Sequence, residues 1–202
     1  MTFRAVIAVL MILCIAVVTN AQRFDEVLRA ELLAMRERDQ RARDDCNKGT
    51  ADERLKCYAS MAETIDKPNT KRLKEIFKSI GFPDAKAVGK DGVEAFYLLL
   101  QHSNDLELKQ QSLPGITKAF EAKLLTPSAY TSFTDRLLFN LGKPQVYGSN
   151  FEIKDGKLVM SNTEDLKNLD KRRKKIGLPP IAEYAKKLKE VYNLDVVVPN
   201  LN

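Results

Sequence analysis

The sequence predicts a mainly α (α+β) fold, a single compact helical domain with a small β-hairpin in its C-terminal third. Two observations support this prediction. Apolar residues recur at helical spacing between capping and stop signals along most of the 202 residues. By contrast, "GKPQVYGSNFEIKDGKLVM", residues 142–160, is rich in strand formers. The chain has no internal repeat and no low-complexity linker, so residues 22–202 are expected to form one domain.

The first residues have the pattern of an export signal. Arg4 precedes an apolar run of 14 residues, Ala5 to Val18, and "TNAQ" follows with small or neutral residues. A run of this length is typical of a signal peptide and short for a membrane span. Residues 1–21 are therefore predicted to be a signal peptide, cleaved before Gln22, and the mature protein to be secreted, with no membrane contact. An uncleaved membrane anchor is the alternative.

In the N-terminal half, helices are predicted at residues 24–45, 51–65, 69–80 and 91–102. The first has an apolar stripe that begins at Val27. "TADE", beginning at Thr50, is a capping box for the second, and Pro68 is expected to break that helix. Residue 69 or 70 then caps the third helix, and Gly81 ends it.

In the C-terminal half, helices are predicted at residues 106–125, 127–141, 163–176 and 180–193. Pro114 is expected to interrupt the first of these, and Thr163 to cap the third. Between them, "PQVYGS" is expected to be a strand. "FEIK" and "KLVM" flank Asp155 and Gly156, and this pair of turn residues between strand formers predicts a β-hairpin.

The cysteines are predicted to have a structural role. Cys14 would leave with the signal, so Cys46 and Cys57 remain, and an even number in an oxidising compartment predicts one disulfide. Gly49, in a left-handed conformation, would end one helix between them, so the bridge would staple a helical hairpin. The Cys-x-x-Cys spacing of redox-active pairs is absent, and no histidine lies nearby to complete a metal site. We therefore predict no metal.

The formal net charge is +6, and acidic and basic residues alternate along most of the chain. The exception is "DKRRKK", Asp170 to Lys175. A nucleic-acid or heparin patch is one interpretation, and a solvated helix face is the other. Because no aromatic residues are interleaved to stack on bases, nucleic-acid binding is not expected.

Several stretches of the chain resemble one family along nearly the whole mature sequence. They are "LRAELLAMRERDQ" from Leu28, "NTKRLKEI" from Asn69, "GFP" to "VG" over residues 81–89, "LLLQH" over 98–102, "TDR" over 134–136, "GKPQVYGS" over 142–149 and "DKRRKKIGLPPIAEY" over 170–184. The chain resembles the bacterial family called domain of unknown function 6624. The resemblance implies a shared fold and a set of marked positions, but no reaction. The chain departs from the family in its export signal, in its cysteine pair, and in reading "YGSN" where the family usually has Tyr-Gly-Thr-Gln.

His102 is the only histidine of the chain and the candidate catalytic residue. It ends an apolar helix, where a protonated imidazole interacts favourably with the helix dipole. Histidine is also the side chain that titrates near neutral pH. The alternative is a structural histidine bonded to a backbone carbonyl or to Asp135.

The candidate ligand-binding residues are polar or charged and lie on separate segments: Gln101, Asp135, Arg136, Gln145, Tyr147, Arg172 and Arg173. Arginines can bind a carboxylate or phosphate through two hydrogen bonds. Neighbouring side chains on a helix point about 100° apart, so Asp135 and Arg136 are not both expected to face one ligand. For each arginine, the alternative is a salt bridge that holds the hairpin to the helices.

Three functional interpretations remain open. The chain has no nucleophile motif, phosphate loop, paired histidines or metal-ligand spacing, which argues against well-marked hydrolases, kinases and metalloenzymes. The first interpretation is a secreted domain that binds a small anionic molecule through a His/Arg/Gln/Tyr cluster. The second is an acid–base enzyme of the hydrolase or lyase type that uses His102. The third is a structural or interaction protein with no ligand site. No cofactor is implied, and protein partners are not indicated.

Overall fold

The computed structural model describes residues 24–199, so the predicted signal peptide, residues 1–21, lies outside the described residues. The helical elements are α1 (Glu26–Asn47), α2 (Ala51–Met61), a π-helical segment η1 (Ala62–Asp66), α3 (Lys67–Ile80), α4 (Ala85–His102), α5 (Leu106–Glu121), α6 (Pro127–Asn140), a short 3₁₀ helix η2 (Leu166–Asn168), α7 (Leu169–Lys175) and α8 (Ile181–Tyr192). The strands are β1 (Phe151–Lys154), β2 (Lys157–Met160) and β3 (Val196–Val197).

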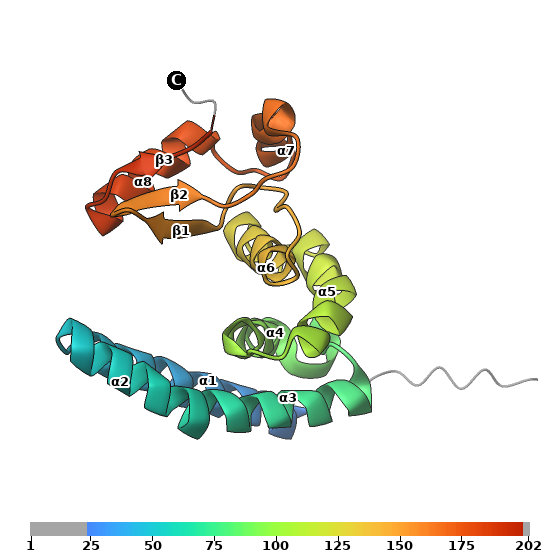
Figure 1. The fold of residues 1–202 in the computed structure, drawn as a ribbon. Coiled ribbons are helices and arrows are strands. Elements are labelled where there is room, and N and C mark those ends of the chain that lie inside the picture. Colours follow the sequence, from blue (N-terminus) through green and yellow to red (C-terminus); the bar gives the residue numbers. More distant parts are fainter. Residues whose placement is uncertain (1–23, 200–202) are drawn as a thin grey trace, which may run out of the picture.

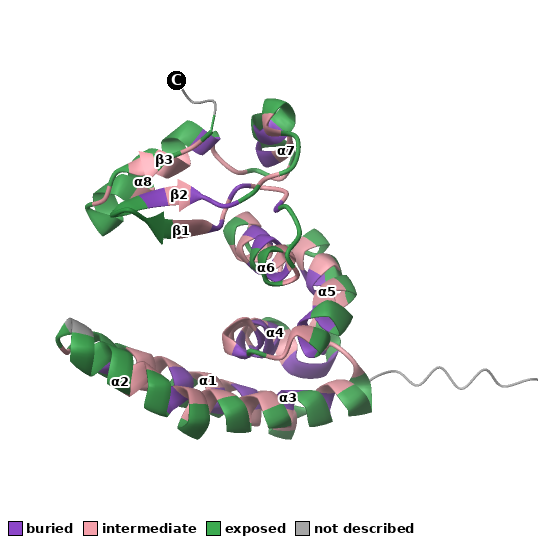
Figure 2. Cartoon of the chain, viewed as in Figure 1, coloured by how far each residue is buried: buried purple, intermediate pink, exposed green. Residues whose placement is uncertain are grey.

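The chain folds as three tiers (Figure 1). α1 lies alongside α2 and α3 in the first tier, α4, α5 and α6 form the second, and the sheet with α7 and α8 forms the third. The main apolar core lies between the first two tiers, and α4 is its most buried element (Figure 2). Met160, Leu169 and Ile181 form a second, smaller apolar core within the third tier. The mainly α prediction with a small C-terminal β element is confirmed.

α1 and α2 form a helical hairpin whose tip extends beyond the rest of the fold (Figure 1). Cys46 and Cys57 form a disulfide across this hairpin, as the sequence predicts. The capping box at Thr50 is also confirmed, because its side chain and that of Glu53 satisfy each other's backbone N–H. Two expectations were wrong. Gly49 does not adopt a left-handed conformation, and Val27 is 80% exposed rather than part of the apolar stripe.

The helix from residue 51 does not break at Pro68. Instead it widens into the π-helical segment and continues directly as α3, with Pro68 in the first turn of α3. Proline is tolerated there because the first turn of a helix needs no backbone N–H donor. Thr70 is consequently not a cap; its hydroxyl donates to the backbone carbonyl of Asp66 and lies 2.9 Å from the hydroxyl of Ser103. Gly81 ends α3 with a φ of 72°, as predicted.

α4 and α5 also differ from the predicted helices. α4 starts at Ala85, earlier than predicted, and bends at Gly89, whose φ of 72° is left-handed. Asp91 then begins the longer part of α4 and accepts a hydrogen bond from Arg29 of α1 at 3.0 Å. α5 runs through Pro114 without a break. The predicted interruption there was wrong, and the surrounding packing explains it, because Ser112 and Ile116 are fully buried on either side.

The sheet has the order β1-β2-β3, with β1 and β2 antiparallel and β3 parallel to β2. Asp155 and Gly156 make the predicted turn, both with positive φ. β3 was not predicted. "PQVYGS" is a loop with a single bridge from Gln145 to Thr163, and not a strand. Thr163 therefore caps no helix, and α7 starts at Leu169. Within residues 24–199, none of the helices combines the length and apolar content that a membrane span requires.

Candidate functional site

His102 lies at the C-terminal end of α4, where three helical segments meet. It contacts Asp39 and Arg43 of α1, and Asp66 at the end of η1 binds Arg43. We call these four residues the His102 cluster. Asp39 is fully buried, whereas the side chain of His102 is 21% exposed. The imidazole is therefore anchored by a buried carboxylate, and part of the ring is exposed to solvent.

Nδ1 of His102 lies within hydrogen-bond distance of both an acceptor and a donor. Nδ1 of His102 lies 2.9 Å from Oδ2 of Asp39, and Nε of Arg43 lies 3.0 Å from the same nitrogen. A bare Nδ1 would point its lone pair at the carboxylate, so we infer that Nδ1 carries a proton and donates it to Asp39. Arg43 has other acceptors, since its Nη2 donates to Asp66 at 2.6 Å and to Asp39 at 3.1 Å. Nε2 is then the free nitrogen, with no hydrogen-bond partner among residues 24–199.

The two carboxylates of the cluster have pKa values shifted in opposite directions. Burial alone would raise the pKa of the Asp39 carboxyl, but the hydrogen bonds from His102 and Arg43 outweigh burial and lower this pKa. Burial raises the pKa of Asp66, and Arg43 opposes that shift. The lowered pKa keeps Asp39 ionised as an acceptor for His102 and Arg43.

Asp135 lies on α6 and holds the loop between α6 and β1. It is fully buried, and it accepts hydrogen bonds of 2.8–3.2 Å from the backbone N–H groups of Val146, Tyr147 and Ser149. The Ser149 hydroxyl donates to the same carboxylate at 2.8 Å. These donors occupy the carboxylate, and in the described part of the chain no hydrogen bond joins it to His102. Asp39 is the carboxylate that binds His102.

Gln145 and Tyr147 belong to the same loop. The Gln145 side chain is fully buried and donates to the carbonyls of Asn150 and Ser161 at 3.0 and 2.9 Å. It also accepts from the Asn150 N–H at 2.8 Å. The Tyr147 ring packs edge-on against Tyr130, and burial raises the pKa of its hydroxyl. The amide of Gln145 is thus engaged in holding the loop.

Arg172 and Arg173 bind the loop from the other side. Their acceptors are mainly backbone carbonyls, those of Val146, Glu164 and Asp165 for Arg172 and those of Tyr147 and Pro179 for Arg173, at 2.6–3.0 Å. Arg173 is buried and also lies 5.1 Å from the centre of the Tyr184 ring. These hydrogen bonds engage both guanidinium groups in holding the loop and the segments next to it.

Gln101 and Arg136 are placed differently from the other candidates. Arg136 is exposed although its neighbour Asp135 is fully buried, as the 100° step of a helix predicts. Gln101 is half-buried, and its backbone carbonyl accepts a hydrogen bond from Lys109 at 3.1 Å. Neither side chain forms a hydrogen bond within residues 24–199. The predicted residues therefore divide among the His102 cluster, the Asp135 loop and this third position.

Sequence reasoning missed Asp39, Arg43 and Asp66. A signal for Asp39 was present, because Leu32, Met35 and Asp39 are spaced i, i+3 and i+7 and so share the buried face of α1. A carboxylate on an apolar stripe needs a partner, and Arg43 follows at i+4. Asp66 had no such signal, because its position depends on the extra residue of the π-helical turn.

Comparison with known proteins identifies one family. The model of a family of unknown function, DUF6624, matches residues 26–197. No curated protein and no solved structure matches the chain. Within the described residues, no group of three or more histidine, cysteine, aspartate or glutamate side chains is placed to hold a metal ion.

Proposed function

The chain belongs to the DUF6624 family, whose description names no activity, and we propose that its His102 cluster is an acid–base site. In this proposal Asp39 orients the imidazole through Nδ1, and Nε2 exchanges a proton with a small ligand. The observation that supports it most directly is the pairing of a fully buried Asp39 with a partly exposed His102 at 2.9 Å. A buried carboxylate that holds one ring nitrogen leaves the other available as a general base.

The anion-binding interpretation that relies on the loop residues has less support. Asp135, Gln145, Arg172 and Arg173 direct their polar groups to backbone atoms of the chain itself. A ligand at that loop would have to compete with these internal hydrogen bonds, most of which are at least partly buried. We therefore assign the Asp135 loop a structural role and the His102 cluster the chemical one.

We also propose that the protein is exported. The pattern of residues 1–21 supports a cleaved signal, and the Cys46–Cys57 disulfide is typical of oxidising compartments. The mass of the protein recovered from outside the cell tests this proposal. A chain that begins at Gln22 and loses two mass units on bridge formation is expected, and a chain that retains residues 1–21 contradicts export by cleavage.

Chemical modification tests whether Nε2 is available. Diethyl pyrocarbonate acylates accessible neutral imidazoles, and the change in ultraviolet absorbance is unambiguous because the chain has one histidine. We expect His102 to react in the folded protein. If it reacts only after unfolding, Nε2 is not available to a ligand and the acid–base proposal is wrong.

Kinetics test whether the site acts on a ligand. A panel of esters, lactones and hydroxy acids covers hydrolysis and proton abstraction, and each compound is assayed with wild type, His102→Gln and Asp39→Asn. General-base catalysis predicts a loss of kcat/KM of about 100-fold or more for His102→Gln. Asp44→Asn is the matched control, because Asp44 is exposed on the same helix. Turnover that survives His102→Gln unchanged, in variants with normal melting temperatures, assigns the activity to another part of the chain.

A further inference from the structure

Lys109, on α5, is a buried ammonium group with few acceptors. The residue is 5% exposed, and Nζ donates to the backbone carbonyl of Gln101 at the end of α4. An ammonium has three donors, and within residues 24–199 the carbonyl of Gln101 is the one acceptor that Nζ contacts. Buried donors normally have acceptors, because a desolvated N–H without one is unfavourable. Within residues 24–199, the ammonium of Lys109 therefore has one hydrogen-bond acceptor for its three donors.

Arg136, on α6, carries a second positive charge near enough to act on Lys109. Burial and, to a smaller extent, the charge of Arg136 together lower the pKa of Lys109 to about 8. In the described part of the chain, neither side chain forms an ion pair with a carboxylate. Two cations that repel each other without a counter-ion are the arrangement that an anion would stabilise.

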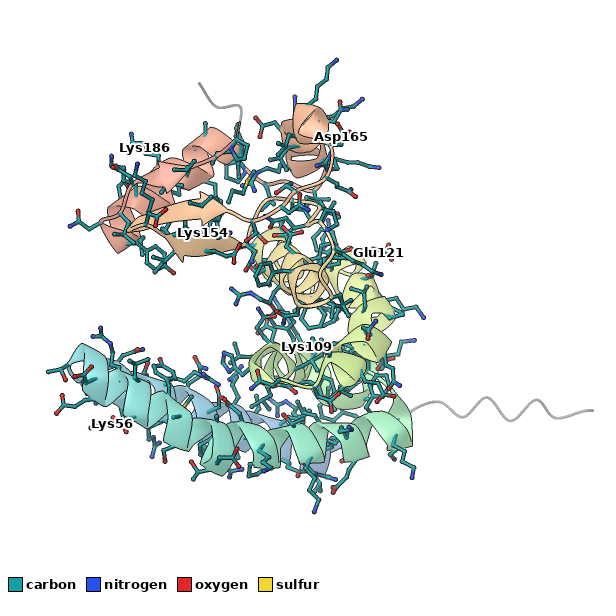
Figure 3. The ribbon with its side chains drawn as sticks, viewed as in Figure 1. Lys56, Lys109, Glu121, Lys154, Asp165 and Lys186 are labelled. Carbon is teal, nitrogen blue, oxygen red and sulfur yellow. A yellow bond between two sulfur atoms is a disulfide. The ribbon has the colours of Figure 1, made fainter. Side chains whose placement is uncertain are left out.

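The backbone carbonyl of Gln101 binds Lys109, and helix spacing indicates which side of α4 its side chain occupies. Tyr97, four residues earlier on that helix, donates its hydroxyl to the carbonyl of Ala129 and packs its ring against Phe133. Gln101 therefore lies on the face of α4 that is turned toward α6. On α6, Arg136 follows Ala129 and Phe133 at i+7 and i+3, so it lies on the face turned toward α4. Figure 3 labels Lys109 where α5 meets α4.

We propose that Lys109, Arg136 and Gln101 form a binding site for an oxyanion, a carboxylate or phosphate group carried by a small molecule. The ammonium would supply charge and free donors, the guanidinium two parallel N–H groups, and the amide a neutral donor. Arg136 is exposed and Gln101 is half-buried, so an anion would reach these two side chains from solvent, whereas Lys109 itself is 5% exposed. The proposal does not depend on the acid–base role of His102, because different residues form the site and binding alone is measured.

A purely structural role for Lys109 makes a different prediction. Its ammonium lies at the C-terminal end of α4, where a cation stabilises the helix dipole and binds a free carbonyl. That role requires neither Arg136 nor an anion. Binding that depends on Arg136 therefore distinguishes the two roles.

The test is an NMR titration of the purified protein at pH 7 and constant ionic strength, with inorganic phosphate in one arm and acetate in the other. We expect saturable shifts of the amides around residues 101, 109 and 136, with a Kd of about 1 mM or tighter for at least one anion. Arg136→Gln should weaken binding by about tenfold or more, since a charge-assisted hydrogen-bond pair is lost. Arg38→Gln is the matched control, because Arg38 is exposed on α1, and it should bind as wild type does.

Each outcome decides the proposal. Saturation by phosphate, acetate or both supports the site, and the arm that saturates identifies the oxyanion. The proposal is overturned if neither anion gives saturable shifts, if Arg136→Gln binds like wild type, or if Arg38→Gln weakens binding equally. Lys109→Met is a second variant, and Arg136→Gln alone is sufficient if Lys109→Met does not fold.

Discussion

Nδ1 of His102 lies 2.9 Å from the carboxylate of Asp39, and this contact joins the end of α4 to the middle of α1 across 63 residues of sequence. Ser103, the next residue, binds Thr70 of α3, so the end of α4 is attached to both long helices of the first tier. A network with this many partners restricts the imidazole to one orientation. In a ring held in one orientation, the nitrogen that carries the proton of the neutral imidazole can be determined by experiment.

The tautomer of His102 is the first prediction. Since we infer that Nδ1 donates to Asp39, the neutral imidazole should carry its proton on Nδ1, whereas free histidine prefers Nε2. Long-range ¹⁵N–¹H NMR spectra distinguish the two forms, and a single histidine removes any ambiguity of assignment. Asp39→Asn should shift the population toward the Nε2 tautomer, and Asp44→Asn should leave it unchanged. A neutral wild-type imidazole with its proton on Nε2 would mean that Nδ1 accepts from Arg43, and the acid–base geometry would then be wrong.

The second prediction concerns the disulfide at the hairpin tip. α2 packs mainly against α1 and η1, and most of its described side chains are exposed or half-buried (Figure 2), so apolar burial contributes little to its stability. Reduction, or the double change of Cys46 and Cys57 to Ser, should therefore destabilise the tip by about 2–4 kcal/mol. Hydrogen exchange should accelerate in residues 44–61 first.

The core of the second tier provides the internal control for this measurement. Amides of α4 around Phe96 and Leu100, both fully buried, should keep their protection when the bridge is reduced. Uniform acceleration along the whole chain would contradict the prediction, because it would mean that the tip and the core unfold as one unit.

The third prediction concerns Asp135. Asp135→Asn replaces one acceptor oxygen with an amide group that faces N–H donors of the loop, and it removes the charge that strengthens the remaining bonds. We expect the free energy of unfolding to fall by about 3 kcal/mol, measured by chemical denaturation. Asp44→Asn, at an exposed position, should change it by less than about 0.5 kcal/mol. A loss confined to ligand binding, with normal stability, would instead make Asp135 a site residue.

Local signals explain which parts of the fold were predictable. The helix that Gly81 ends, the capping box at Thr50 and the turn at Asp155 depend on residues next to one another, so the sequence contains the information. Pro68 and Pro114 misled the prediction because propensity describes an isolated helix. In the fold, the π-helical segment places Pro68 in a first turn, and buried neighbours stabilise the helix around Pro114.

The candidate site was predictable only in part. His102 stood out as the single histidine, and Asp39 could have been recognised on the buried stripe of α1. The burial of Lys109 could not be predicted, because a lysine in a charged helix is normally solvated. Its burial depends on how α5 packs against α4, which the local sequence does not specify. Asp135 and Gln145 were predicted to bind a ligand, but the same residue types stabilise loops and bind ligands. The hydrogen-bond partners in the structure are needed to distinguish the two roles.

The last prediction follows from the pKa of Lys109. The folded-state value is about 8, against 10.5 for a free lysine. Between these values the unfolded chain binds the proton and the folded chain does not, so raising the pH removes a charge that burial disfavours. The free energy of unfolding should therefore rise from about pH 8 to pH 10, by on the order of 2 kcal/mol. Above pH 10 the sign reverses, because burial raises the pKa of Tyr97 to about 12 and the unfolded tyrosine ionises first.

Denaturation curves at half-unit pH steps, in buffers without phosphate or carboxylate ions, measure this rise. Lys109→Met lacks the titrating group, so its stability should stay nearly constant over the same interval. Lys118→Met is the matched control, because Lys118 is exposed on the same helix, and it should follow the wild-type curve. A wild-type stability that falls from pH 8 to 10 would mean that the ammonium is stabilised in the folded state. Lys109 would then have an anionic partner within the chain itself, and the site would need no external oxyanion.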